Sequence, residues 1–155
     1  MSYLVDKLSP DHSLHPRNLK IRAKVDQFLY FDQGTLTPSN RKIYGPIVFH
    51  GDIAPPPEAV VEYKEKLAML EKHLEGKKFL VTDKHTIADI AIYVTLSQSR
   101  LADFDLSEFK AVKTWVDTMK EVLAGEEEIV STPLAEFKAI AYERRKDLLA
   151  EQSKR

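Results

Sequence analysis

A hydroxyl and a carboxylate lie three residues apart in the segment Thr86-Ile87-Ala88-Asp89-Ile90. At the start of a helix, the Thr86 hydroxyl can accept the backbone N–H of Asp89, and the Asp89 carboxylate can accept the backbone N–H of Thr86. We therefore expect a reciprocal capping box with Thr86 as structural N-cap. A general-base role for Asp89 is the alternative, but the cap needs only this local spacing.

The five histidines offer base or ligand chemistry without a supporting pattern. His12 and His15 lie beside Asp11 in a segment that contains proline and has no fixed helical register, which favours a solvated loop over a metal site. The other three are scattered and have no nucleophile or acid at a useful spacing. The chain has no cysteine, so a cysteine nucleophile and a thiolate zinc site are excluded. We predict no catalytic triad and no metal site.

Three other features have a structural and a functional interpretation. Asp32 ends an apolar stretch, where a carboxylate must be paired, so we expect a structural partner rather than a catalytic role. The acidic run 126–128 is expected to be a solvated connection. Four aromatic residues are either core residues at helical spacing or the wall of a hydrophobic ligand pocket. They are Tyr30, Phe31, Tyr44 and Phe49.

Length and composition indicate one globular domain over residues 1–155. The chain is 43% hydrophobic and 30% charged, and its net charge is −1. No third of it is basic enough to suggest nucleic acid. The longest apolar run, residues 90–94, is far shorter than the roughly 20 residues that span a bilayer. The first residues do not resemble a secretion signal, so we expect no membrane partner and a cytoplasmic location.

Apolar residues recur every three or four positions along most of the chain, which indicates amphipathic helices. The clearest stripe lies between Pro57, which can start a helix, and Gly76, which suits the left-handed position after one. Its residues are Val60, Tyr63, Leu67, Leu70 and Leu74. An earlier helix should begin after Asn18 as N-cap and be kinked or staggered near Pro38 and Pro46.

Three further helices complete the prediction. The box at Thr86 opens a helix that is apolar nearly all round, so it should lie at the centre of the fold. A later helix carries Trp115, and a last one follows Pro133. The apolar face of that last helix comprises Leu134, Phe137, Ile140, Ala141 and Leu148. Residues 78–82 are too short and isolated to build a sheet. The predicted fold class is all-α, a packed helical bundle.

The Thr86–Asp89 box resembles the opening of the central helix in the C-terminal helical domain of cytosolic glutathione S-transferases. Other segments are similar to the insect delta and epsilon classes, in the same order along the chain. They are residues 3–7, 11–16, 22–27, 29–32, 34–36, 74–76 and 104–107, together with Trp115. The tail matches weakly after Glu121 and poorly after residue 124. The resemblance implies that the bundle belongs to this domain type and that residues 1–8 are the stub of a preceding helix.

In that family a thioredoxin-like domain comes first. It contributes the hydroxyl or thiol that activates glutathione and a Glu-Ser pair that binds the γ-glutamyl end. The resemblance begins just after that pair, so it implies that this chain lacks the N-terminal domain and a complete glutathione site. Glutathione would be the family's co-substrate, while the chain itself would hold no cofactor. A native start at Met1 and a truncation both fit the sequence.

The resemblance also implies where an electrophile would bind. In the family the first long helix lines that pocket with aromatic or charged side chains about one turn apart. The matching positions are Thr37, Arg41, Gly45 and Phe49, with Tyr44 beside them. Only Arg41 and Phe49 keep the character of a pocket residue. The expected substrate-binding set is therefore Thr37, Arg41, Tyr44, Gly45 and Phe49, with no catalytic residue.

Two classes of function follow. In the first, the chain supplies the hydrophobic electrophile-binding half of a detoxifying transferase and does not conjugate glutathione alone. In the second, it is a non-catalytic protein–protein interaction module, as similar domains are in elongation-factor and tRNA-synthetase complexes, or a carrier of small hydrophobic ligands. Possible partners are a second copy of the chain or a full-length relative.

Overall fold

The structure is a computed structural model that describes residues 1–8 and 14–152. All regular elements of this part of the chain are helical, which confirms the all-α prediction. The α-helices are α1 (Ser2–Leu8), α2 (Leu19–Phe31), α3 (Thr37–Gly45), α4 (Pro57–Leu74), α5 (Ile87–Gln98), α6 (Lys110–Val122) and α7 (Thr132–Gln152). Shorter helical turns are η1 (Asp32–Leu36), η2 (Pro46–His50), η3 (Ser99–Ala102) and η4 (Glu127–Ser131).

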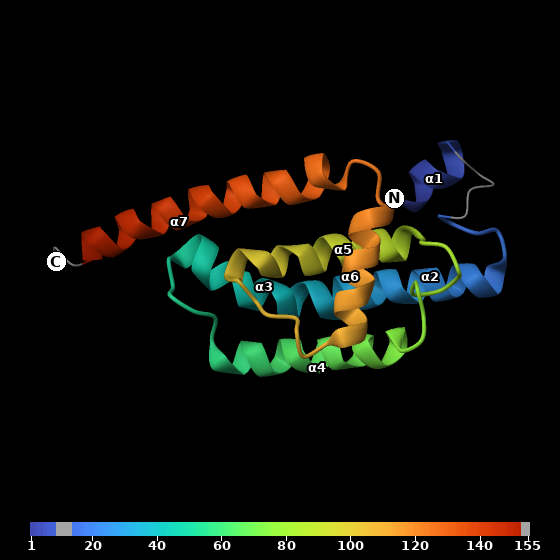
Figure 1. Cartoon of the computed structure of the whole chain (residues 1–155), viewed down its shortest axis with the longest axis horizontal. Coiled ribbons are helices and arrows are strands. Elements are labelled where there is room, and N and C mark those ends of the chain that lie inside the picture. Colours follow the sequence, from blue (N-terminus) through green and yellow to red (C-terminus); the bar gives the residue numbers. More distant parts are fainter. Residues whose placement is uncertain (9–13, 153–155) are drawn as a thin grey trace.

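Helices α2 and α3 form one long rod with η1 and η2, which runs between α5 and α4 in the view of Figure 1. The Asn18 side chain caps its start, accepting the backbone N–H of Lys20 at 3.0 Å and of Ile21 at 3.2 Å. Both η1 and η2 are π-helical, and Pro38 and Pro46 lie just after one and at the start of the other. Proline lacks an N–H and crowds the carbonyl four residues earlier, which the wider π-turn relieves. The predicted disturbance at these prolines is confirmed.

Helix α4 buries four of the five residues in the stripe that the sequence predicts, and the fifth, Val60, is half-buried. Tyr63, Leu67, Leu70 and Leu74 are all buried in the core. Gly76 follows with a φ of +69°, the left-handed conformation in which glycine avoids the steric cost of a Cβ. The spacing of the apolar residues and the residues at the two ends are therefore enough to predict this helix.

Helix α5 occupies the centre, in contact with α2, α3 and α6 (Figure 1). Both Ile92 and Leu96 are fully buried, and the ring of Tyr93 meets that of Trp115 edge-on at 6.5 Å. This position explains why the segment is apolar on nearly every side. A helix surrounded by others on most sides leaves little surface for water, and Val94 is the one exposed residue of α5.

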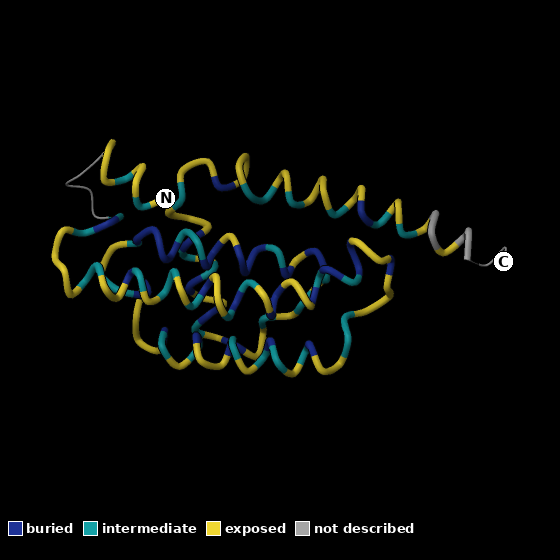
Figure 2. Tube along the Cα trace, turned by 180° about the vertical axis from the view of Figure 1, so that it is seen from behind, coloured by how far each residue is buried: buried dark blue, intermediate teal, exposed yellow. Residues whose placement is uncertain are grey.

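Helix α7 lies along one side of the bundle and extends past it (Figure 1). Of its apolar residues, Ala141 is buried beside Val48 and Leu101, but Phe137 is 42% exposed and Ile140 is 67% exposed. Much of the helix is accordingly coloured as exposed in Figure 2. The apolar face that the sequence predicts for α7 is therefore only partly covered by the described chain.

Glu126 is not solvated, so the prediction of a solvated acidic connection over residues 126–128 is wrong at this position. Its side chain is buried, with 5% of the residue exposed. It accepts a hydrogen bond from the Tyr93 hydroxyl and another from the Ser131 hydroxyl at 2.8 Å. Glu127 and Glu128 are exposed, as expected. Burial is tolerated because the carboxylate oxygens have donors.

The prediction that His15 lies in a solvated loop is also wrong, because its side chain is buried. It is 4% exposed, and its Nδ1 lies 2.9 Å from Asp6 Oδ1. The Arg22 side chain also bonds to Asp6, at 3.1 Å, and donates to the His15 carbonyl at 3.3 Å. These contacts attach α1 to the start of α2. His12 and Asp11 lie outside the described residues.

Candidate functional site

Thr86 and Asp89 form the predicted capping box at the start of α5. Asp89 Oδ2 accepts the Thr86 backbone N–H at 2.8 Å and the Thr86 hydroxyl at 2.9 Å. Both residues are fully buried. The carboxylate therefore serves the helix terminus and has no access to solvent or substrate, which favours the structural role.

Asp89 has two more donors that the sequence did not reveal. Its Oδ1 accepts the Leu80 backbone N–H at 2.9 Å and the Trp115 indole Nε1–H at 3.2 Å. One carboxylate thus joins the loop before α5, the cap of α5 and the middle of α6. Neither hydrogen bond could be predicted from the residues next to Asp89, because the partners are 9 and 26 residues away in sequence.

Arg41, Gly45 and Phe49 follow one another on successive turns of α3 and η2, and Gly45 is buried whereas Arg41 and Phe49 are exposed. Arg41 is exposed and has no hydrogen bond or ion pair with any described residue, and Phe49 is 49% exposed. A Cβ added at Gly45 would lie 3.7 Å from Arg41 Cγ and 3.9 Å from Phe49 Cδ2. The two side chains therefore flank a position with no side chain. We call these three residues the α3 face.

Thr37 and Tyr44 lie beside the α3 face and are used for packing. The Thr37 hydroxyl is 3.3 Å from Asp32 Oδ1 and 3.2 Å from the Thr95 hydroxyl of α5. Tyr44 packs against the cluster that joins η2 to α7. Asp32 is buried and also accepts from the Gln33 side chain at 3.0 Å, so it has the structural partners that the sequence predicts.

Comparison with known proteins agrees with this architecture. Residues 41–121 match the model of the glutathione S-transferase C-terminal domain. The Bombyx mori glutathione transferase BmGSTD1 is 34% identical, with a TM-score of 0.83 over 89% of this chain and 64% of that chain. A delta-class glutathione transferase of Nilaparvata lugens is 31% identical, with a TM-score of 0.84 over 93% of this chain and 67% of that one. This chain belongs to the glutathione S-transferase family.

The glutathione S-transferase relatives are longer than this chain. An epsilon-class enzyme of the housefly Musca domestica is 30% identical, and the chain covers 65% of it with a TM-score of 0.78. The described residues therefore correspond to the C-terminal helical domain, in agreement with the predicted fold. The remaining third of those relatives has no counterpart in the alignment.

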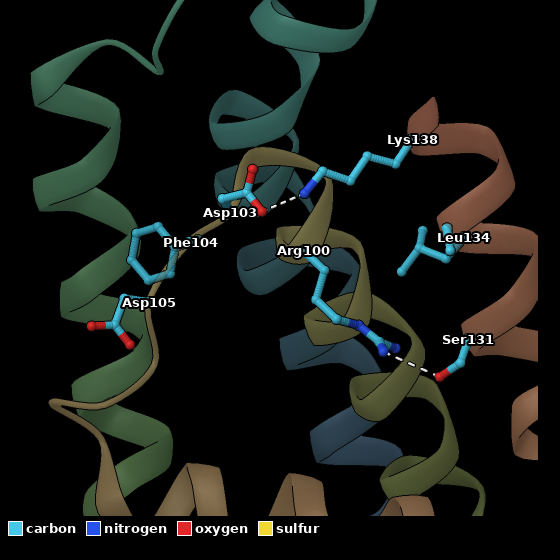
Figure 3. A pocket seen from close by; sticks show the side chains of 8 residues that line it. Arg100, Asp103, Phe104, Asp105, Ser131, Leu134 and Lys138 are labelled. Carbon is cyan, nitrogen blue, oxygen red and sulfur yellow. Dashed lines mark hydrogen bonds and ion pairs between the residues drawn. The ribbon is translucent and has the colours of Figure 1, made fainter. Parts of the chain in front are cut away.

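A cavity of about 510 Å³ lies between η3 and the start of α7 of this glutathione S-transferase domain (Figure 3). Its charged side chains have hydrogen-bond partners: Asp103 accepts from Lys138, and Arg100 Nη1 donates to Ser131 at 3.1 Å. A second cavity, about 350 Å³ and mostly apolar, shares Leu134 with the first. None of the five residues expected to bind substrate lines either cavity.

Titratable side chains of the described residues are not gathered into a metal site. No group of three or more potential ligands is present there. Burial raises the pKa of the Tyr93 hydroxyl to about 12, and its hydrogen bond to Glu126 acts in the same direction. Nor is any described helix long and apolar enough to cross a membrane.

Proposed function

We propose that this chain supplies the electrophile-binding half of a glutathione transferase and that the α3 face is part of that half. In this proposal residues 1–155 act as one helical domain, with Arg41, Gly45 and Phe49 in contact with the ligand. Thr37 and Tyr44 border the contact. The observation that carries the proposal is the exposed Arg41 cation and the exposed Phe49 ring on either side of the buried Gly45, in a chain of this family.

Glutathione is the co-substrate in this proposal, and the group that activates its thiol is not among the residues of the α3 face. A free thiol has a pKa of about 8.5, so conjugation near neutral pH requires a group that stabilises the thiolate. The Thr37 hydroxyl beside this face is hydrogen-bonded to Asp32 and Thr95. We therefore expect the isolated chain to bind hydrophobic ligands without accelerating conjugation.

A substitution at Gly45 tests the binding half of the proposal. The probe is N-phenyl-1-naphthylamine, a neutral aromatic dye, titrated by fluorescence into the purified chain. Gly45→Leu places a side chain between Arg41 and Phe49 and should weaken binding by roughly tenfold, equivalent to about 1.4 kcal/mol. Gly34→Leu is the matched control, because Gly34 lies on the same rod with no atom within 4 Å of its Cβ position. Equal dissociation constants for the two variants would refute the proposal.

A rate measurement tests the catalytic half. The chain should not raise the rate at which 1-chloro-2,4-dinitrobenzene reacts with glutathione above that in buffer. A rate well above buffer, abolished by heat denaturation of the chain, would show that a complete site exists and that this half of the proposal is wrong.

A protein-interaction module is the second candidate. Exposed apolar side chains favour it, because large uncovered patches mark interaction surfaces. They are Tyr3, Leu4 and Leu8 on α1, Val94 on α5, Ile129 on η4, and Phe137 and Ile140 on α7. The chain should then dimerise or bind a full-length relative in the cytoplasm. Sedimentation of a stable monomer at micromolar concentration would contradict this function.

A further inference from the structure

Helix α1 is attached to the bundle by few side chains. None of its residues is buried, and Val5 is the one that packs against the hydrophobic core of the described chain. Its other apolar residues are more than half exposed. The polar contacts of Asp6 with His15 and Arg22 are therefore a large part of the attachment.

His15 is the buried member of this contact. Its Nδ1 lies 2.9 Å from Asp6 Oδ1, and because an ionised carboxylate can only accept, Nδ1 carries a proton and donates it. Its Nε2 has no hydrogen bond within the described residues and lies 3.9 Å from Asp26 Oδ1 of α2. A second proton, on Nε2, would let the ring donate toward Asp26 as well.

The charges around the His15 ring favour that second proton. Asp6, Arg22 and Asp26 together carry a net charge of −1, which a protonated imidazole neutralises. The hydrogen bond from His15 lowers the pKa of the Asp6 carboxyl below its usual value, so Asp6 stays ionised near neutral pH. Histidine is the side chain that ordinarily changes its charge between pH 5 and 8. The buried ring therefore lies where its charge alters the attachment of α1.

Other charged groups of the packed elements are directed elsewhere. Lys7 of α1 lies over an aromatic ring of its own helix, 5.6 Å from the centroid. Lys20 and Lys24 of α2 are exposed. The start of α5 contacts this segment through the backbone N–H of Ile87, which donates to the carbonyl of residue 14 at 2.9 Å. Asp89, the charged residue of α5, is engaged in the cap of that helix.

We infer that the contact between His15 and Asp6 is a pH-sensitive switch, which holds α1 against the bundle more tightly when His15 is protonated. Protonation gives the donor a charge as well as the acceptor, so the hydrogen bond becomes an ion pair and strengthens. Arg22 bonds to the same carboxylate in either state, at 3.1 Å. Raising the pH therefore loosens α1 without removing all its contacts. This inference concerns α1 and does not depend on the function proposed for the α3 face.

A nitroxide spin label on α1 tests the switch in the full chain. The chain has no cysteine of its own, so Leu4→Cys, at an exposed position of α1, takes a single label. Electron paramagnetic resonance then measures the ratio of mobile to restrained label. From about pH 8 to about pH 5.5 this ratio should fall by about three- to tenfold, the gain expected when a neutral donor becomes a charged one.

Two variants of the labelled chain should remove this response. His15→Gln cannot be protonated, and Asp6→Asn keeps an acceptor without its charge. The Asp6 side chain is 41% exposed, so Asp6→Asn should fold even if the substitution of the buried His15 does not. His50→Gln is the matched control, because His50 is exposed on η2 and should leave the response within twofold of the parent's.

The inference is overturned if the ratio of mobile to restrained label is the same at both pH values. It is also overturned if the response persists in a folded His15→Gln or Asp6→Asn chain, because another group would then be responsible. A response that is lost in these variants and kept in His50→Gln supports the switch.

Discussion

Asp89→Ala should be among the most destabilising single substitutions in this chain. The carboxylate is fully buried and accepts hydrogen bonds from three groups that water cannot reach: the backbone N–H of Leu80, the backbone N–H of Thr86 and the indole N–H of Trp115. Alanine removes all three acceptor contacts at once. The Thr86 hydroxyl loses its acceptor as well, but it can rotate.

The magnitude follows from those three donors. A buried donor left without a partner costs about 1–3 kcal/mol. Three of them would cost about 3–9 kcal/mol, and part of this is offset because the mutant no longer buries a carboxylate. We expect the free energy of unfolding to fall by about 3–5 kcal/mol, which exceeds the roughly 1 kcal/mol of an ordinary helix cap. Asp89→Asn should cost less, because its side-chain oxygen can still accept from Leu80 and Trp115.

Urea denaturation followed by circular dichroism measures these values. Asp83→Ala is the control, because Asp83 is exposed in the loop just before the box and should change stability by no more than about 0.5 kcal/mol. The expected order of destabilisation is Asp89→Ala, then Asp89→Asn, then Asp83→Ala. An Asp89→Ala variant as stable as Asp83→Ala would refute the reasoning, and unchanged stability with abolished activity would support a general base instead.

Three other predictions concern different parts of the fold. Burial raises the pKa of Glu126, but hydroxyl hydrogen bonds and nearby cations lower it by more, so the net pKa lies below the usual 4.5. A carboxyl group whose pKa is lower in the folded chain than in the unfolded chain stabilises the fold above the unfolded pKa, and this contribution is lost as the pH falls through the folded pKa. Below pH 4.5 the Glu126→Gln variant should therefore lose less stability than the parent protein in an acid titration. Gly76→Ala should lower the free energy of unfolding by about 1 kcal/mol, because φ is +69° at Gly76. Gly34→Ala, at a helical position, should leave it unchanged or raise it by up to about 1 kcal/mol. Equal effects of the two substitutions in urea denaturation would contradict this prediction. Ile140→Ser should change the stability by at most about 0.5 kcal/mol, and Ala141→Gln should lower it by about 1–3 kcal/mol. If thermal melts show Ile140→Ser to be the more destabilising of the two, α7 packs differently.

The sequence predicted those features that depend on neighbours within a few residues. The Thr86–Asp89 box, the Asn18 cap and the glycine after α4 each need only local backbone geometry. The same holds for the spacing that places Arg41, Gly45 and Phe49 on successive turns. Such features follow from the helix repeat, so a single sequence is enough to recognise them.

Tertiary structure decided which side chains are buried and what they meet. Trp115 and Leu80 donate to Asp89 only because α6 and the preceding loop pack against the start of α5. Glu126 looked like part of a solvated acidic run, yet it is buried because Tyr93 supplies a hydroxyl from 33 residues away. The spacing of α7 predicted an apolar face but not that Ile140 would remain exposed. Periodicity specifies the direction of a side chain around its own helix, whereas burial depends on whether another element covers that direction.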